Sequence, residues 1–365
     1  MVRRHIKRAR RKIKRARLKL DSVISSFLPH AVVLIYHRVT YLDSDPHRLS
    51  VTPENFDKHM ELISRKFQPI SLRELVDDLA ANGRVRDRAV VVTFDDGYED
   101  NYLYASPILE KYAVPATIFV SSGYTGSNRE FWWDELERLL LNNETLPEEI
   151  HASLNGGVYR RIVSSNAHPA CQELAPGADA SEAEQRCASP LEIHRELCTR
   201  FQTLAPHQID RALAELRELT GDDGTARPNN LPMDTEQLSS IHRGGLIEIG
   251  AHTRSHINLA AQSAEQQFDE IQGSKTDLED ILGARVESFS YPFGTIGHYS
   301  PWTIECVQNA GFRSALANFS GIVSRLSNQY EIPRCLIRDW DKKTFKDKMN
   351  RYYAGTRQVA AHGKR

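Results

Sequence analysis

Short, almost wholly apolar runs recur along the chain, and each ends in polar residues. The runs are Ala31–Tyr36, Ala89–Thr93, Ala116–Val120, Leu246–Ile249 and Ser288–Tyr291. Runs without polar alternation are typical of strands that a parallel sheet buries on both faces. Helical spacing of apolar residues predicts helices between them, at Pro53–Lys66, Ser71–Asn82, Ala105–Tyr112, Ser263–Leu282 and Pro301–Ala310. This alternation predicts an α/β fold of βα units in an open or closed barrel.

The stretch from residue 133 to 235 interrupts the alternation. Helical patterns occur at Trp133–Leu141, Ser189–Leu204 and Gln208–Leu219, with a polar segment rich in Ala, Ser and Gly at Asn166–Ser189. We therefore predict a mainly helical insertion at 133–235, within a barrel that spans 29–345 and precedes a basic tail at 346–365. The insertion is either a lid that faces substrate or a structural element without a part in the chemistry.

The first 28 residues predict a basic amphipathic helix. Apolar residues from Val2 to Phe27 are spaced alternately by four and three, and residues 1–20 hold eleven Lys or Arg and no acidic residue. Such a helix suits either an anionic membrane surface, through residues 1–27, or a solvated tail. The rest of the chain has 36 basic against 48 acidic residues. This excess of acidic residues would repel nucleic acid, so we expect no nucleic-acid partner.

Targeting signals and cysteine usage bear on the compartment. No run of 18 apolar residues occurs, and no small-residue cleavage site follows the basic segment. The five cysteines include no Cys-x-x-Cys pair, and a chain of 365 residues does not need disulfides to fold, so we expect free thiols. These features predict a cytoplasmic protein, which would be peripheral on the inner face of the membrane if the basic helix binds lipid.

Polar residues at two strand ends suggest a metal site. Thr93-Phe94-Asp95-Asp96-Gly97 puts two carboxylates side by side, and these repel unless a cation or a proton lies between them. His252 and His256 have a spacing at which two imidazoles can meet one metal. Two His and one Asp leave positions open for water and substrate, as in catalytic sites. The alternatives are an Asp-Gly turn and a chance His pair. Zinc suits these ligands best, although cobalt, nickel, manganese and iron share them.

These motifs resemble those of a known family. Thr93–Gly97 and His252–His256, in this order at strand ends, are similar to the first two motifs of the polysaccharide deacetylase family (the NodB-homology domain). Phe289–Gly294 resembles the third motif, and the resemblance spans roughly residues 31–340. It implies a distorted (β/α) barrel of about seven parallel strands. It also implies a metal-dependent hydrolase that removes N-acetyl groups from an amino sugar or glycan.

The same resemblance implies roles for individual residues. Asp96, His252 and His256 would bind one divalent metal, and Asp95 would be the general base. A backbone N–H near Phe293 would help to hold the oxyanion, within a substrate-facing segment that includes Tyr291 and Pro292.

Two residues of the family pattern are missing from this chain. Ser290 stands where the third motif usually has the Arg that orients the base. The Leu-x-His sequence that usually follows the third motif, and whose His supplies the acid, is also absent. We expect Arg334 to replace the Arg, the alternative being a surface ion pair. We expect His37, in Tyr36-His37-Arg38-Val39, to supply the acid, as a His does in the branch that resembles poly-N-acetylglucosamine deacetylases. The alternative for His37 is a structural strand-end histidine.

Three activities agree with these residues. The first is N-deacetylation of a glycan, which would be a lipid-linked cell-envelope intermediate if the basic helix binds the membrane. The second is deformylation or deacylation of another amide. The third is glycan binding by an inactive protein on the same barrel, which Ser290 and the missing late His favour.

Overall fold

The computed structural model describes residues 29–82, 85–143, 145–154, 156–164 and 187–353. Ser127–Pro232 forms one compact unit, and the segments on either side of it form the other, so the insertion expected at 133–235 corresponds to a unit at 127–232. The helix expected at 1–28, with its membrane contact at 1–27, lies outside the described residues.

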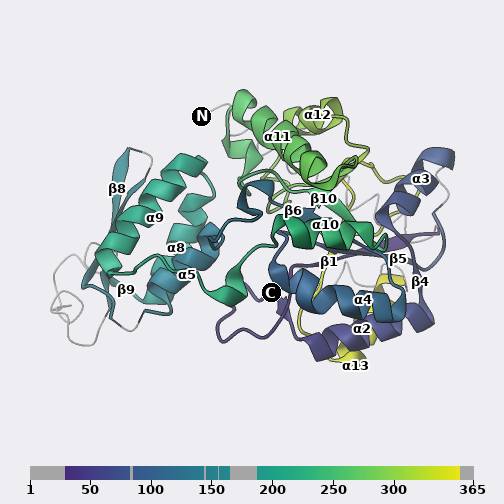
Figure 1. The fold of residues 1–365 in the computed structure, drawn as a ribbon, viewed down its shortest axis with the longest axis horizontal. Coiled ribbons are helices and arrows are strands. Elements are labelled where there is room, and N and C mark those ends of the chain that lie inside the picture. The colour runs from purple at the N-terminus through teal and green to yellow at the C-terminus, as the bar shows by residue number, and fades with distance from the viewer. Residues whose placement is uncertain (1–28, 83–84, 144, 155, 165–186, 354–365) are drawn as a thin grey trace, which may run out of the picture. The chain divides into compact units, whose positions relative to one another are not determined.

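A curled sheet of seven parallel strands forms the centre of the larger unit (Figure 1). The order is β12–β11–β10–β6–β5–β1–β13, and each neighbouring pair is parallel. The strands are β1 (Ala31–Tyr36), β5 (Ala89–Phe94), β6 (Ala116–Val120), β10 (Ile247–Ala251), β11 (Ser288–Ser290), β12 (Ser314–Leu316) and β13 (Cys335–Leu336). Short β4 (Gln68–Pro69) pairs with β5, and β2 (Arg38–Val39) pairs with β3 (Ser50–Val51). This sheet confirms the predicted distorted (β/α) barrel.

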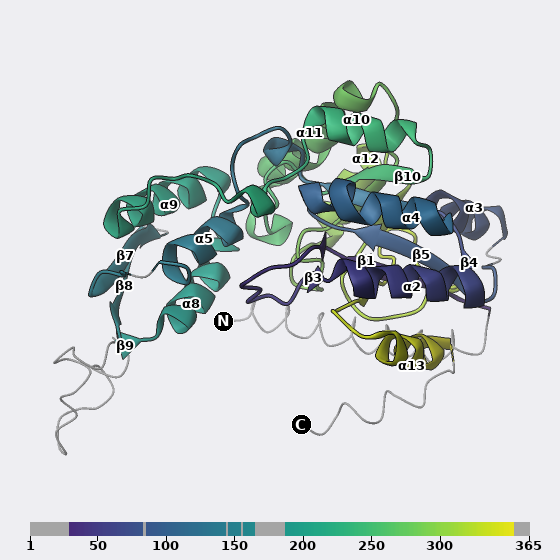
Figure 2. The same ribbon diagram turned by 60° about the horizontal axis from the view of Figure 1, so that its bottom comes forward.

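Helices cover the outside of this sheet (Figures 1 and 2). They are α2 (Pro53–Lys66), α3 (Leu72–Asn82), α4 (Ser106–Tyr112), α10 (Thr235–Arg243), α11 (Ala264–Leu282), α12 (Pro301–Asn309) and α13 (Lys342–Tyr353). The sequence patterns did not predict α10 or α13. Residues 346–353 of the expected basic tail belong to α13, which buries Phe345 and Met349 and packs on α2.

The buried strands explain why their sequences lack alternation. Val32, Leu34 and Tyr36 of β1 belong to one apolar cluster, whereas Ala31 and Val33 belong to another on the opposite face of the sheet. Both faces of the strand are therefore shielded from water. Each buried Val or Leu contributes roughly 1.5–3 kcal/mol to stability relative to an exposed one. The same division holds for β5.

The smaller unit combines helices with a three-stranded sheet that the sequence did not predict. Its helices are α5 (Trp132–Leu140), α8 (Pro190–Phe201) and α9 (Pro206–Thr220), and its strands are β7 (Glu149–Leu154), β8 (Gly157–Val163) and β9 (Cys187–Ala188). β7 and β8 form an antiparallel hairpin, and β9 runs parallel to β8.

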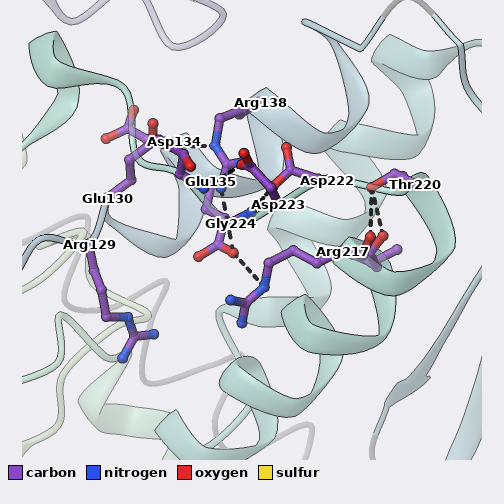
Figure 3. Close-up of polar contacts among 12 residues, drawn as sticks. Arg129, Glu130, Asp134, Glu135, Arg138, Arg217, Thr220, Asp222, Asp223 and Gly224 are labelled. Carbon is purple, nitrogen blue, oxygen red and sulfur yellow. Dashed lines mark hydrogen bonds and ion pairs between the residues drawn. The ribbon is translucent and has the colours of Figure 1, made fainter.

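Ion pairs hold the buried acidic residues of the smaller unit (Figure 3). Glu130 and Glu135 are 2% and 5% exposed. Arg138 lies 3.3 Å from Glu130 and also contacts Asp222, while Arg217 lies 3.1 Å from Glu135. Buried carboxylates are costly unless they are paired, so this network explains how α5 can turn acidic residues inward.

One cysteine expectation was wrong. Cys187 is in a disulfide, whereas Cys198, Cys306 and Cys335 are free. Spacing in the sequence does not reveal which cysteines meet in space, so the pattern could not predict this bond. Because disulfides are rare in the reducing cytoplasm, the cysteines no longer support the prediction of a cytoplasmic protein. Within the described residues, no helix combines the length and the apolar character needed to span a membrane.

Candidate metal centre and active site

Four parallel strands deliver the predicted site residues to one end of the barrel. His37 follows β1, Asp95 and Asp96 follow β5, His252 follows β10, and Ser290 ends β11. The carboxyl ends of parallel strands meet at one face, which is where barrels of this type carry their sites. All five of these side chains are buried, with 0–9% of their surface exposed.

Strained backbone conformations surround the site. Asp96, Thr253, His256 and Phe293 have left-handed φ angles of 78°, 64°, 49° and 60°. Each such conformation costs of order 1–3 kcal/mol in a residue other than glycine, so the surrounding contacts must enforce it. The motifs are therefore held in geometries that their own backbone preferences disfavour.

Asp96, His252 and His256 converge as three metal ligands would. The Nε2 atoms of His256 and His252 lie 3.3 and 3.6 Å from Oδ1 of Asp96. One potential ligand atom from each residue lies within 4.8 Å of the others. Two ligands that are 2.0–2.1 Å from a tetrahedral zinc lie roughly 3.3 Å apart, so these separations fit one ion.

The protonation states also fit a cation. Nδ1 of His252 donates to the carbonyl oxygen of Ser290 at 2.7 Å, so the lone pair of His252 is on Nε2 and faces Asp96. Burial lowers the pKa of His252, and it lowers that of His256 well below the usual value, so both rings are neutral at neutral pH. Neutral imidazoles and an ionised carboxylate are the forms that bind metal.

Asp95 is fixed by Arg334. Nη1 and Nη2 of Arg334 donate to Oδ1 and Oδ2 of Asp95 at 2.6 and 2.7 Å. Nη2 also donates to Oγ of Ser290 at 2.8 Å, and that hydroxyl lies 3.2 Å from Oδ2 of Asp95. Arg334 is 1% exposed, so the structure contradicts the surface-ion-pair alternative.

The guanidinium determines the charge of Asp95. Burial alone would raise the pKa of Asp95, but the nearby positive charge of Arg334 and the hydrogen bonds from its guanidinium lower the pKa below its usual range. Asp95 is therefore an ionised carboxylate in a fixed orientation, with one edge next to the predicted ligands: Oδ2 lies 3.7 Å from Nε2 of His252.

His37 lies beside this cluster as a neutral imidazole. The pKa of His37 is lowered to about 4, chiefly by burial and also by the charge of Arg334, while the charge of Asp95 opposes the shift. Within the described residues, its buried Nδ1 has no hydrogen-bond partner. A neutral ring can accept a proton and pass it on, but it is not a standing acid at neutral pH.

The Tyr291–Phe293 segment has one suitable oxyanion donor. The N–H of Tyr291 donates to the carbonyl of Leu316, and its buried hydroxyl donates to the carbonyl of Tyr330. Pro292 has no N–H. The remaining donor is the N–H of Phe293, whose ring lies 4.8 Å from that of His256. Tyr291 therefore packs and positions the segment, because its side chain is wholly buried.

Two residues that no sequence motif indicates hold the His37 segment. Asp100 accepts from Nε of Arg38 at 2.8 Å and from the N–H of Val39 at 2.9 Å. Asn101 donates to the carbonyl of His37 at 2.9 Å. These contacts tie the segment after β1 to the turn after Asp95 and Asp96. No local pattern indicates them, because the partners are more than 60 positions apart.

Comparison with known sequences identifies the family. The polysaccharide deacetylase model matches residues 82–155 and 201–315, slightly more than half of the chain. The Bacillus subtilis protein YxkH, whose name assigns it to the polysaccharide deacetylases, is 29% identical over 127 residues. That match covers 34% of this chain and 44% of YxkH, so the chain spans less than half of this relative.

Solved structures share the fold. The Streptococcus pyogenes deacetylase PplD superposes with a TM-score of 0.54 at 17% identity, over 88% of this chain and 99% of the other. IcaB from Ammonifex degensii gives the same TM-score and identity, over 89% and 97%. At this identity the likeness supports the fold alone. From the family match, the motifs described above and this shared fold, we conclude that the chain belongs to the polysaccharide deacetylase family of hydrolases.

Proposed function

We propose that the protein is a metal-dependent N-deacetylase of an N-acetylated amino sugar or glycan. The observation that carries this proposal is the three-residue cluster of Asp96, His252 and His256 directly beside an ionised, arginine-held Asp95. Glycan binding alone requires neither a metal-ligand set nor a base next to it. The bound metal, for which zinc suits the ligands best, would make water acidic enough to lose a proton at neutral pH and would polarise the acyl carbonyl.

Asp95 accepts one proton from the attacking water as the new C–O bond forms. Arg334 keeps the Asp95 carboxylate ionised and aimed, and the N–H of Phe293 donates to the oxyanion. That proton must then reach the amine nitrogen as the C–N bond breaks. His37 is neutral at the outset, so it acts as a relay that takes the proton from Asp95 and gives it to the amine. The products are acetate and a free amino sugar.

The inactive-protein alternative loses its main support. It depended on Ser290 and on the absence of a late His. Arg334 makes the bidentate contact with Asp95 that the missing arginine was expected to provide, and Ser290 completes it through its hydroxyl. These contacts support a base-orienting arginine that comes from a different position in the chain.

Acetate release tests the proposal. Oligomers of N-acetylglucosamine are incubated with the zinc-loaded protein, and acetate and binding are both measured. We expect acetate to be released in step with free amines. Release of formate from formylated sugars alone would favour the second activity, and binding without any release would favour the glycan-binding alternative.

A further inference from the structure

The loop between the two predicted histidine ligands is held by a helix outside the metal cluster. Glu270 of α11 is buried, and its Oε2 accepts from the N–H groups of Arg254 and Ser255, each at 2.9 Å. One carboxylate oxygen thus binds two consecutive backbone groups that lie between His252 and His256.

The other side of this loop is fixed as well. The carbonyls of Thr253 and Arg254 accept from the N–H groups of Ser122 and Gly123 at 3.2 and 3.0 Å. A Cβ at Gly123 would come within 2.8 Å of the Arg254 carbonyl oxygen, so the close approach needs a glycine. The loop is therefore clamped between α11 and the turn after β6.

The Arg254 side chain adds a second anchor to α11. Its Nε and Nη2 donate to the carboxylate of Asp277 at 2.7 and 2.6 Å. Asp277 also accepts from the hydroxyl of Ser122 at 2.8 Å, which joins the two sides of the clamp. The guanidinium lies over Gly273, where an added Cβ would come within 2.3 Å of it.

The clamp opposes a strained backbone. Thr253 and His256 both have left-handed φ angles, which an isolated loop of this sequence would leave. If the loop relaxed, the His252 and His256 rings would separate or turn, since each is attached to one end of it. Neither Glu270 nor Asp277 belongs to the predicted ligand cluster or to the proposed proton route.

We propose that Glu270 is a positioning residue that sets the affinity of the protein for its metal. It does so by holding the His252–His256 loop in the conformation that directs both imidazoles at one ion. This inference rests on the metal centre of the proposed function. Residues that orient metal ligands typically contribute 10- to 100-fold to affinity.

The test measures zinc binding by competition with a chelating dye, on metal-stripped protein and without substrate. Glu270→Ala should weaken zinc binding by roughly 10- to 100-fold and alter the visible spectrum of the cobalt-loaded protein. Glu270→Gln keeps an acceptor oxygen at the same distance along the side chain, so it should restore most of the affinity. Glu265→Ala removes an exposed carboxylate from the same helix and should bind zinc as the wild type does.

The possible outcomes separate the inference about Glu270 from the proposed function. Wild-type affinity and an unchanged cobalt spectrum in Glu270→Ala would overturn the inference while leaving the proposed function intact. If Glu270→Gln bound zinc as weakly as Glu270→Ala, the charge of the side chain and not the position of its acceptor oxygen would matter, and this result would also overturn the inference. A wild type that binds no metal would overturn both proposals. If Glu270→Ala does not fold, Glu270→Asp replaces it: this variant keeps the charge but withdraws the oxygen by one methylene, and weakened zinc binding is expected.

Discussion

Replacing Arg334 with Met removes the partner of a buried charge without removing bulk. The Arg334 side chain donates five hydrogen bonds, two of them to Asp95, and it is almost wholly buried. In Arg334→Met, Asp95 remains 3% exposed in the surrounding fold without its guanidinium. Breaking a buried ion pair on one side costs about 3–5 kcal/mol. We expect the free energy of unfolding of the metal-free protein to fall by about this amount at pH 7.

The cost should depend on pH with a definite sign. In the wild type, the pKa of Asp95 is lower in the folded protein than in the unfolded chain, where it is about 3.9. The ionised group therefore stabilises the fold at pH values above 3.9, and this stabilisation is lost as the pH falls through the folded pKa. In Arg334→Met, burial is no longer opposed by the guanidinium, so the pKa of Asp95 rises and the group takes up a proton more readily. The difference between the two proteins should therefore shrink as the pH falls from 7 to 4.

Urea unfolding in the presence of a chelator measures both effects. The double variant Asp95→Asn with Arg334→Met should be more stable than Arg334→Met alone, because the unpaired charge is gone. Arg325→Met, at an exposed position, is the matched control and should stay within about 0.5 kcal/mol of the wild type. A cost below about 1 kcal/mol for Arg334→Met, or strict additivity in the double variant, would show that the guanidinium does not stabilise the buried charge of Asp95.

Three further predictions follow from other parts of the chain. Burial lowers the pKa of His59 to about 4 from 6.5, so stability should fall by roughly 3 kcal/mol as the pH drops through this window. His59→Gln should flatten the pH dependence of urea unfolding there, and an unchanged slope would contradict the assignment. His37→Ala should strongly reduce turnover and leave zinc content intact, and near wild-type turnover would remove His37 from the mechanism. Deletion of residues 1–27 should abolish sedimentation with anionic vesicles, and equal, negligible sedimentation of both forms would end the membrane hypothesis.

The elements predictable from sequence are those with long, one-sided or wholly buried patterns. The ranges of β1 and α2 agree with the predictions to the residue, because six consecutive apolar positions and four turns of helical spacing are strong signals. β12 and β13 are three and two residues long, too short for any period to appear. The β7–β8 hairpin was missed because β7 alternates polar and buried apolar residues, so it lacks the continuous apolar run by which the strands of the central sheet were recognised.

Some features of the candidate site can also be predicted from local motifs, whereas others depend on contacts between distant parts of the chain. Asp95, Asp96, His252 and His256 lie in local motifs at strand ends, so sequence and topology together bring them to one face. The pairing of Arg334 with Asp95 joins residues 239 positions apart. The family resemblance led us to expect it, but the sequence left a surface ion pair open, and only the fold decides between the two. The left-handed backbone at Asp96 and His256 could not be predicted either, because distant contacts impose it.

The decisive experiment measures metal content and acetate release together on the wild type, Asp95→Asn and His256→Ala. For the wild type we expect about one metal ion and acetate release. We expect retained metal without activity for Asp95→Asn, and loss of both for His256→Ala. A wild type that binds no metal, or an Asp95→Asn variant that releases acetate at the wild-type rate, would contradict the proposed function.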